Sequence, residues 1–228
     1  MVGVVDLSDP KSWMNLLLLA PPLLLSLTVH EYAHARTALA FGDPTAKLMG
    51  RVTLNPLAHL DPIGTLCLLF SGIIGWARPV PVNPANLRPP RLGDIMVSVA
   101  GPMSNLLLAV LCGLALRGLD RYANPDTAFF RTAWLLLWYT TVANLGLCAF
   151  NMIPLYPLDG HHVARELLPA HRRAPFMNWQ VRYGSPLLMA LIFIPVMVRM
   201  ATGRRVPFDP IAYIQTQFIE RFLSILVS

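Results

Sequence analysis

One stretch, residues 14–41, restricts the possible fold of this chain more than any other. Its first half is an apolar run suited to a membrane-spanning helix, and its second half carries the sequence HEYAH at positions 30–34. An ionisable side chain at the centre of a membrane helix costs roughly 2.5–3.5 kcal/mol on insertion scales, so its presence there indicates function. The chain has only three glutamates, and of these Glu31 alone lies in a strongly apolar segment.

The spacing of the two histidines in this stretch predicts a metal site. Positions i and i+4 of a helix lie on one face, so His30 and His34 can direct two imidazole nitrogens at one metal ion. Glu31 follows the first histidine, as does the carboxylate that activates water in zinc proteases. The alternative is that both histidines are polar packing residues and that Glu31 pairs with Arg36 at the membrane edge. The scarcity of glutamates favours the metal site.

Composition predicts a polytopic membrane protein. Of the 228 residues, 55% are hydrophobic and 13% are charged, whereas about 25% of a soluble domain is charged. The length leaves room for several spans but for no added soluble domain, so we expect a single membrane-embedded domain over residues 1–228. The net charge is +6, with arginines spread between apolar runs. Such arginines commonly face anionic lipid headgroups, and we expect no nucleic-acid partner.

Apolar runs and helix breakers predict an all-α fold with small β segments. We expect spans at residues 14–41, 95–116, 131–153 and 184–201, and a further helix at 211–227. Gly42-Asp43-Pro44 is expected to end the first helix. Three other segments are expected to be non-helical: a short strand pair at 45–54, a re-entrant or membrane-surface segment at 63–77, and extended chain at 78–93, where prolines prevent a helix. Residues 165–183 read as a basic loop.

A third metal ligand is expected near the end of the third span. The sequence NMIPLYPLDG occupies residues 151–160, and its two prolines should end the helix. Zinc proteases often complete a histidine pair with a carboxylate, which makes Asp159 a candidate, although it could merely cap the next helix. His161 and His162 are rival ligands that residue chemistry alone does not exclude. His59 could also join the site, but a lone loop histidine more often bonds backbone or water.

The combined motifs resemble those of site-2 proteases, the zinc metalloproteases that cut within membranes. HEYAH, GRVTLNPLAHLDPIG, WARPVPVNP, AGPMSN and NMIPLYPLDG occur here in the order seen in that family, over about residues 25–165. The resemblance implies one catalytic Zn²⁺ held by His30, His34 and Asp159, with Glu31 as general base. It also implies that Asn151 helps to hold the substrate carbonyl or its oxyanion, and it gives His161 and His162 no catalytic role.

The resemblance further implies a three-span catalytic core at about residues 14–165, followed by an extra span and tail helix at about 184–227. Small sheets are expected around Gly50 and Val80, and no PDZ or CBS domain. The expected function is intramembrane proteolysis of transmembrane protein substrates in a bacterial or archaeal plasma membrane. Other partners would be a regulatory membrane protein or further copies of this chain.

The sequence also bears on two alternative functions, a scaffold and a metal transporter, and on the orientation in the membrane. A catalytically silent zinc-binding scaffold has no need of Glu31, and a metal transporter is expected to carry paired polar residues on several spans. The proposed cytoplasmic segments carry nine basic residues against seven on the opposite side, which favours a site that opens to the cytoplasm.

Overall fold

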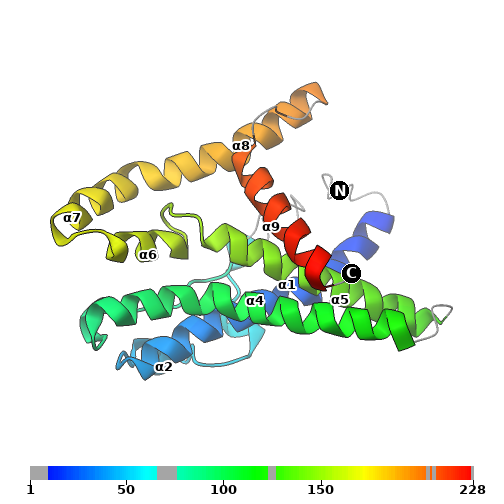
Figure 1. The fold of residues 1–228 in the computed structure, drawn as a ribbon, viewed down its shortest axis with the longest axis horizontal. Helices are drawn as coiled ribbons and strands as arrows, with labels where there is room; N and C mark the ends of the chain where they lie inside the picture. The colour runs from blue at the N-terminus through cyan, green and yellow to red at the C-terminus, as the bar shows by residue number, and fades with distance from the viewer. Residues whose placement is uncertain (1–9, 66–75, 123–126, 204–205, 207–208, 227–228) are drawn as a thin grey trace.

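Three long helices form the centre of the fold. The computed structural model describes residues 10–65, 76–122, 127–203, 206 and 209–226. In it α1 (Pro10–Ala40), α4 (Pro90–Tyr122) and α5 (Ala128–Asn151) all contact one another (Figure 1). These helices correspond to the first three predicted spans. α1 continues through Pro21 and Pro22 as one helix and ends before Gly42, as predicted.

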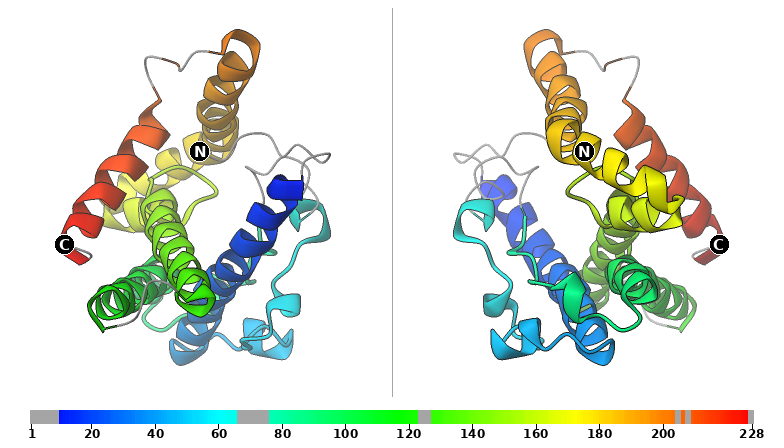
Figure 2. Two further views of the ribbon diagram at one scale, coloured as in Figure 1. Left: turned by 90° about the vertical axis from the view of Figure 1, so that its right-hand side faces the viewer. Right: turned by 90° about the vertical axis from the view of Figure 1, so that its left-hand side faces the viewer.

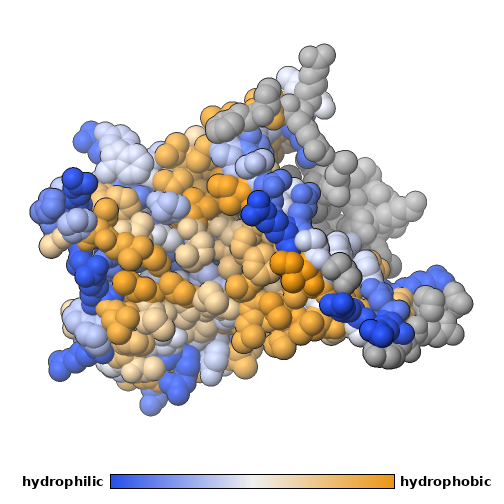
Figure 3. All heavy atoms as spheres, viewed as in Figure 1, coloured by the Kyte–Doolittle hydropathy of each residue, from blue (hydrophilic) through white to orange (hydrophobic). Residues whose placement is uncertain are grey.

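The described residues include three helical stretches that are long and apolar enough to cross a membrane. They are residues 90–121, residues 128–151 and the continuous helical stretch 170–202. Hydrophobic residues cover the middle of the visible face, and hydrophilic residues gather at its two ends (Figure 3). This is the distribution expected of a protein with its middle in lipid and its ends in water. α1 is not among these three stretches, and its crossing of the membrane stays a prediction.

The segment between α1 and α4 contains no strand in its described part. Thr45–Leu48 form the short helix α2, and short 3₁₀ turns occupy Pro56–Ala58 and Pro84–Asn86. The only pairing there is an isolated antiparallel bridge between Leu60 and Ala77. The predicted small sheets around residues 45–54 and Val80 are therefore wrong within the described chain. Most of the predicted membrane-surface segment at 63–77 lies outside the described residues.

The Asp43 side chain accounts for this absence of strands. It is fully buried and accepts hydrogen bonds from the backbone N–H and the hydroxyl of Thr45, which starts a helical turn. It also accepts from the backbone N–H of Asn83 and the side-chain amide of Asn86. Burial alone would raise the pKa of Asp43, but these hydrogen bonds outweigh it and lower the pKa. One carboxylate thus ties the end of α1 to the extended chain before α4.

The C-terminal half continues as helices. α6 (Asp159–Leu167) and α7 (Ala170–Trp179) lead through a π-helical turn, Gln180–Gly184, into α8 (Ser185–Thr202). The expected basic loop at 165–183 is thus wrong, because alanine, arginine and methionine are good helix formers whatever their charge. α9 (Pro210–Leu226) runs back against α5, on the opposite side of α1 from residues 42–65 (Figure 2). The fourth span and the tail helix are confirmed as helices.

Candidate metal centre

The two histidines of HEYAH lie where α1 and α4 come closest. His30 and His34 are one helical turn apart and both are buried. Gly101 of α4 faces them, and a Cβ atom at this position would overlap the ring of His34 and approach that of His30. A glycine is needed here because any side chain would occupy the space between the two imidazoles. The missing side chain of Gly101 therefore lets α4 lie close to both histidines and leaves the space in front of their rings open.

A hydrogen-bond relay fixes the proton of His30 on Nδ1. Asn144 Nδ2 donates to the backbone carbonyl of Thr140 at 2.7 Å, which orients the Asn144 amide. Asn144 Oδ1 then faces Asn105 and accepts a hydrogen bond from Asn105 Nδ2 at 2.7 Å. Asn105 Oδ1 is then left to accept from His30 Nδ1, at 2.5 Å. A neutral imidazole carries one proton, so the Nε2 of His30 holds a free lone pair.

His34 has the same tautomer for a simpler reason. Its Nδ1 lies 2.7 Å from the backbone carbonyl of Val97, which can only accept a hydrogen bond. Its Nε2 therefore also holds a lone pair, and the two Nε2 atoms lie 3.0 Å apart. Two neutral imidazoles do not present lone pairs to each other at this distance unless a positive charge, a proton or a metal ion, lies between them.

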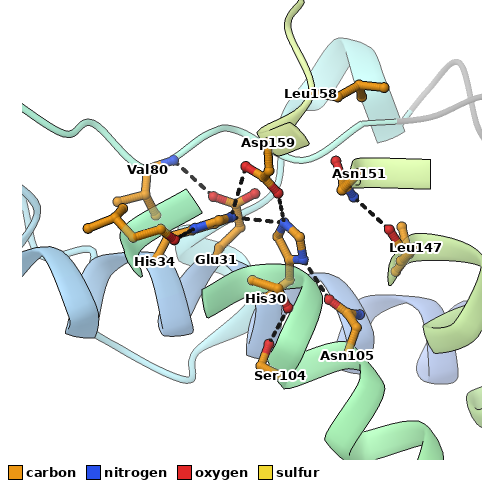
Figure 4. A network of polar contacts seen from close by, with 12 residues as sticks. His30, Glu31, His34, Val80, Ser104, Asn105, Leu147, Asn151, Leu158 and Asp159 are labelled. Carbon is orange, nitrogen blue, oxygen red and sulfur yellow. Dashed lines mark hydrogen bonds and ion pairs between the residues drawn. The ribbon is translucent and has the colours of Figure 1, made fainter. Parts of the chain in front are cut away.

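Asp159 completes the group from the start of α6. Its two carboxylate oxygens lie 3.2 Å from His30 Nε2 and 3.4 Å from His34 Nε2 (Figure 4). Oδ2 is buried and has no hydrogen-bond partner. The carboxylate thus acts as more than a helix cap.

The geometry and donor set of these three residues fit a zinc ion. His30, His34 and Asp159 each offer one ligand atom within 4.8 Å of the others. Ligands about 2.0–2.1 Å from a tetrahedral zinc ion lie about 3.3 Å from one another, and the observed separations are 3.0, 3.2 and 3.4 Å. Two imidazoles and one carboxylate are also a donor set of catalytic zinc, with a fourth position left for water or substrate.

The Glu31 carboxylate lies beside this group and is held by the main chain. Its Oε2 accepts a hydrogen bond from the backbone N–H of Val80 at 2.9 Å (Figure 4). The alternative of an ion pair with Arg36 is absent from the described residues, and Arg36 is exposed. The extended chain before α4 thus contributes a backbone group next to the carboxylate.

Other residues singled out from the sequence lie outside the metal group. Asn151 is half-buried, and its Nδ2 donates to the carbonyl of Leu147 (3.0 Å), away from the group (Figure 4). His59 Nε2 contacts the Thr53 carbonyl at 2.9 Å, which confirms the preference for a backbone partner.

The two rival histidines also lie outside the group. His161 is buried and its Nδ1 contacts the Leu158 carbonyl at 2.6 Å, while His162 lies 3.5 Å from Asp94. Burial lowers the pKa of His161 to about 4. Both histidines therefore belong to the packing of α6.

Several residues that support the site were not identified from the sequence. The roles of Gly101, Asn105 and Asn144 were missed, although the AGPMSN motif contains two of the three. Arg165 of α6 donates to Asp94 of α4 at 2.7 Å and so anchors the helix that begins with Asp159. Such cross-helix pairs leave no signal in local spacing.

Comparison with known proteins also supports a zinc site. Residues 118–195 match the family model described as Peptidase family M50. The chain is 42% identical over 190 residues to "Putative zinc metalloprotease YwhC" of Bacillus subtilis, with 82% of this chain and 84% of that protein covered. It is 33% identical over 203 residues to "Putative zinc metalloprotease Rip2" of Mycolicibacterium smegmatis, with 85% and 74% covered. No solved structure matches significantly.

These likenesses extend over most of the chain and agree with the resemblance to site-2 proteases found in its motifs. The apolar helices are those of a membrane protein, and the three ligand-bearing residues fit the zinc ion that the relatives' names specify. The chain therefore belongs to Peptidase family M50, the site-2 protease family, and is a membrane zinc metalloprotease.

Proposed function

We propose that this protein hydrolyses peptide bonds in or near transmembrane segments of membrane proteins. His30, His34 and Asp159 hold the zinc ion in this proposal, and Glu31 is the general base. The observation that carries it is the convergence of two imidazole Nε2 atoms and the Asp159 carboxylate, whose ligand atoms all lie within 4.8 Å of one another. They converge beside helices that are apolar enough to cross a membrane, which fits a substrate that is itself a membrane protein.

Each residue of the group has a defined task in this reaction. Bound Zn²⁺ would acidify the attacking water and polarise the scissile carbonyl. Glu31 accepts the proton of that water and passes it to the leaving amine. The Val80 N–H bonds Oε2 of Glu31 and so limits the rotation of the carboxylate. Asn105 and the Val97 carbonyl keep Nδ1 protonated on His30 and His34, so both can face a metal through Nε2.

Asn151 is proposed to stabilise the charge that develops on the substrate carbonyl. Its amide carries two N–H donors, and Leu147 engages its nitrogen from one side. Removal of one such donor in other hydrolases lowers kcat about 10²–10³-fold. We expect Asn151→Leu to lower kcat while zinc content stays at the wild-type value.

A membrane-spanning substrate must unwind before it is cut, because a helix hides its carbonyls in i→i−4 hydrogen bonds. The extended chain at residues 78–83 lies beside Glu31 and presents carbonyl groups to such a substrate. Its own donors are mostly occupied, because Val80 bonds Glu31, Asn83 bonds Asp43, and prolines stand at positions 79 and 81. We therefore propose that this stretch mainly accepts hydrogen bonds from the unwound substrate.

We further propose that the site opens toward the cytoplasm of a bacterial or archaeal cell. The end of the molecule nearest the site carries Lys47, Arg51, Arg88 and Arg91, and basic side chains favour the cytoplasmic face. Labelling of single cysteines placed at Lys47 and at Arg117, from either side of sealed vesicles, tests this orientation. A regulatory membrane protein or a second copy of the chain is a further proposed partner.

The decisive experiment compares Glu31→Gln with wild type in liposomes that contain a single-span substrate, and measures bound zinc in both. We expect Glu31→Gln to keep its zinc and to cut about 10²–10⁴-fold more slowly, the usual contribution of a general base. Glu220→Gln is the matched control, because Glu220 is an exposed glutamate on α9. It should cut at the wild-type rate.

The same assay separates the proposal from its rivals. A wild type that holds zinc but cuts no substrate supports the scaffold, and equal cutting by Glu31→Gln refutes the assigned base. The cleaved sequence should also be placed in a soluble protein. If the soluble form is cut and the membrane-embedded form is not, intramembrane proteolysis is refuted.

A further inference from the structure

The loop that carries Asp159 is held by a side chain from a different helix. Gln180, in the π-helical turn between α7 and α8, is almost fully buried. Its Nε2 donates to the carbonyl of Pro154 at 2.8 Å, and its Oε1 accepts from the N–H of Tyr156 at 2.8 Å. One carboxamide thus binds two backbone groups of the 154–156 loop, which connects Asn151 to Asp159.

The loop cannot provide these partners itself. Pro154 and Pro157 have no N–H, and the chain here forms no regular helix, so Tyr156 N–H and the Pro154 carbonyl depend on a partner from elsewhere. Both hydrogen bonds are partly buried, and without them nothing in the loop itself holds these two backbone groups in place.

The π turn and Gly184 allow this contact to form. A Cβ atom at Gly184 would lie 2.8 Å from Gln180 Oε1 and 3.0 Å from the Cβ of Tyr156. Only glycine lets the loop approach the helix at this point. π turns within α-helices frequently mark functional sites. Further along the loop, Leu158 packs in a cluster with Leu188 of α8, so the loop is held on both sides.

We propose that Gln180 is a positioning residue for the metal centre, acting through the 154–156 backbone on Asp159. α7 and α8 then have a second task besides crossing the membrane, because they set the distance of Asp159 from the two histidines. This inference rests on the proposed role of Asp159 as a ligand. Groups hydrogen-bonded directly to a metal ligand typically change metal affinity 10–100-fold, and Gln180 acts through the intervening loop, so we expect the lower end of this range.

The test is the zinc affinity of Gln180→Met, a substitution of similar shape that removes both hydrogen bonds. We expect the zinc dissociation constant to rise about 10-fold or more, the visible spectrum of the cobalt-substituted protein to change, and the Tyr156 amide to exchange faster with deuterium. Gln217→Met on α9 is the matched control, because Gln217 is exposed. It should leave all three measurements unchanged.

Two further variants keep the test decisive. Gly184→Ala crowds the same contact from the other side and should give the same changes, which covers the case of a Gln180 variant that does not fold. A folded Gln180→Met with zinc affinity within twofold of wild type and an unchanged cobalt spectrum refutes this inference and leaves the ligand assignment of Asp159 intact. Asp159→Asn that binds zinc as wild type does refutes the ligand assignment, and the inference with it.

Discussion

Replacing Asn105 with leucine should weaken zinc binding without removing any metal ligand. Asn105 and Asn144 have no exposed surface and His30 is only 5% exposed, so water cannot replace the lost carboxamide. The Nδ1–H of His30 would lose its acceptor, and the imidazole would be free to adopt the other tautomer or to rotate. Both changes remove the lone pair that Nε2 offers to the metal.

The size of the effect follows from two independent estimates. A buried group left without its hydrogen-bond partner costs about 1–3 kcal/mol. Loss of a partner that orients a metal-binding histidine lowers affinity 10–100-fold, which equals about 1.4–2.7 kcal/mol. The two ranges overlap, so we expect the zinc dissociation constant of Asn105→Leu to rise by one to two orders of magnitude.

The assay is competition for zinc between the purified protein in detergent and a chelator of known affinity. Ser104→Ala is the control, because Ser104 lies next to Asn105 and its hydroxyl bonds only the Gly101 carbonyl of its own helix. The double variant Asn105→Leu/Asn144→Leu removes both carboxamides and should recover part of the thermal stability, because Asn144 is no longer left unpaired, without recovering affinity. A folded Asn105→Leu that binds zinc within twofold of wild type would contradict the relay.

Three further changes probe other parts of the site. Gly101→Ala places a methyl group between the histidines and should abolish stoichiometric zinc binding, measured by metal analysis, whereas Gly118→Ala on the same helix has open space and should bind normally. Val80→Pro removes the N–H that holds Glu31, the proposed general base, and should lower kcat about 10-fold with zinc content unchanged. An unchanged kcat would show that this bond is dispensable. Hydrogen bonds lower the pKa of Asp43, so its stabilising effect is present above about pH 4 and is lost as the pH falls through the lowered pKa. Asp43→Asn should therefore lower the free energy of unfolding by about 1.5–3 kcal/mol at neutral pH and by progressively less in acid, measured by unfolding in detergent. A difference from wild type that stays constant with pH would contradict this.

Local patterns in the sequence predicted the long helices and the grouping of His30, His34 and Asp159. The i, i+4 spacing of His30 and His34 survives in the fold because it is a property of one helix. Asp159 was reached through its motif, since two prolines and a glycine fix the turn that carries it. The ends of α1 and α5 were likewise marked by prolines.

Features that depend on contacts between distant residues could not be predicted. The strand pair expected at 45–54 is replaced by a helical turn because Asp43 binds Thr45 and also Asn83, 40 residues away. The relay from Asn144 to His30 joins three helices. Gln180 reaches a loop 24 residues earlier in the chain. Each of these contacts exists only after the helices have packed.

The bond between Val80 and Glu31 has a consequence for how this enzyme can change over time. Its donor is a main-chain N–H, which every residue except proline supplies. The side chain at position 80 is therefore free to vary while the bond to Glu31 is kept. Substitutions at this position, proline excepted, can then change the surface beside the proposed catalytic carboxylate while its backbone hydrogen bond is kept.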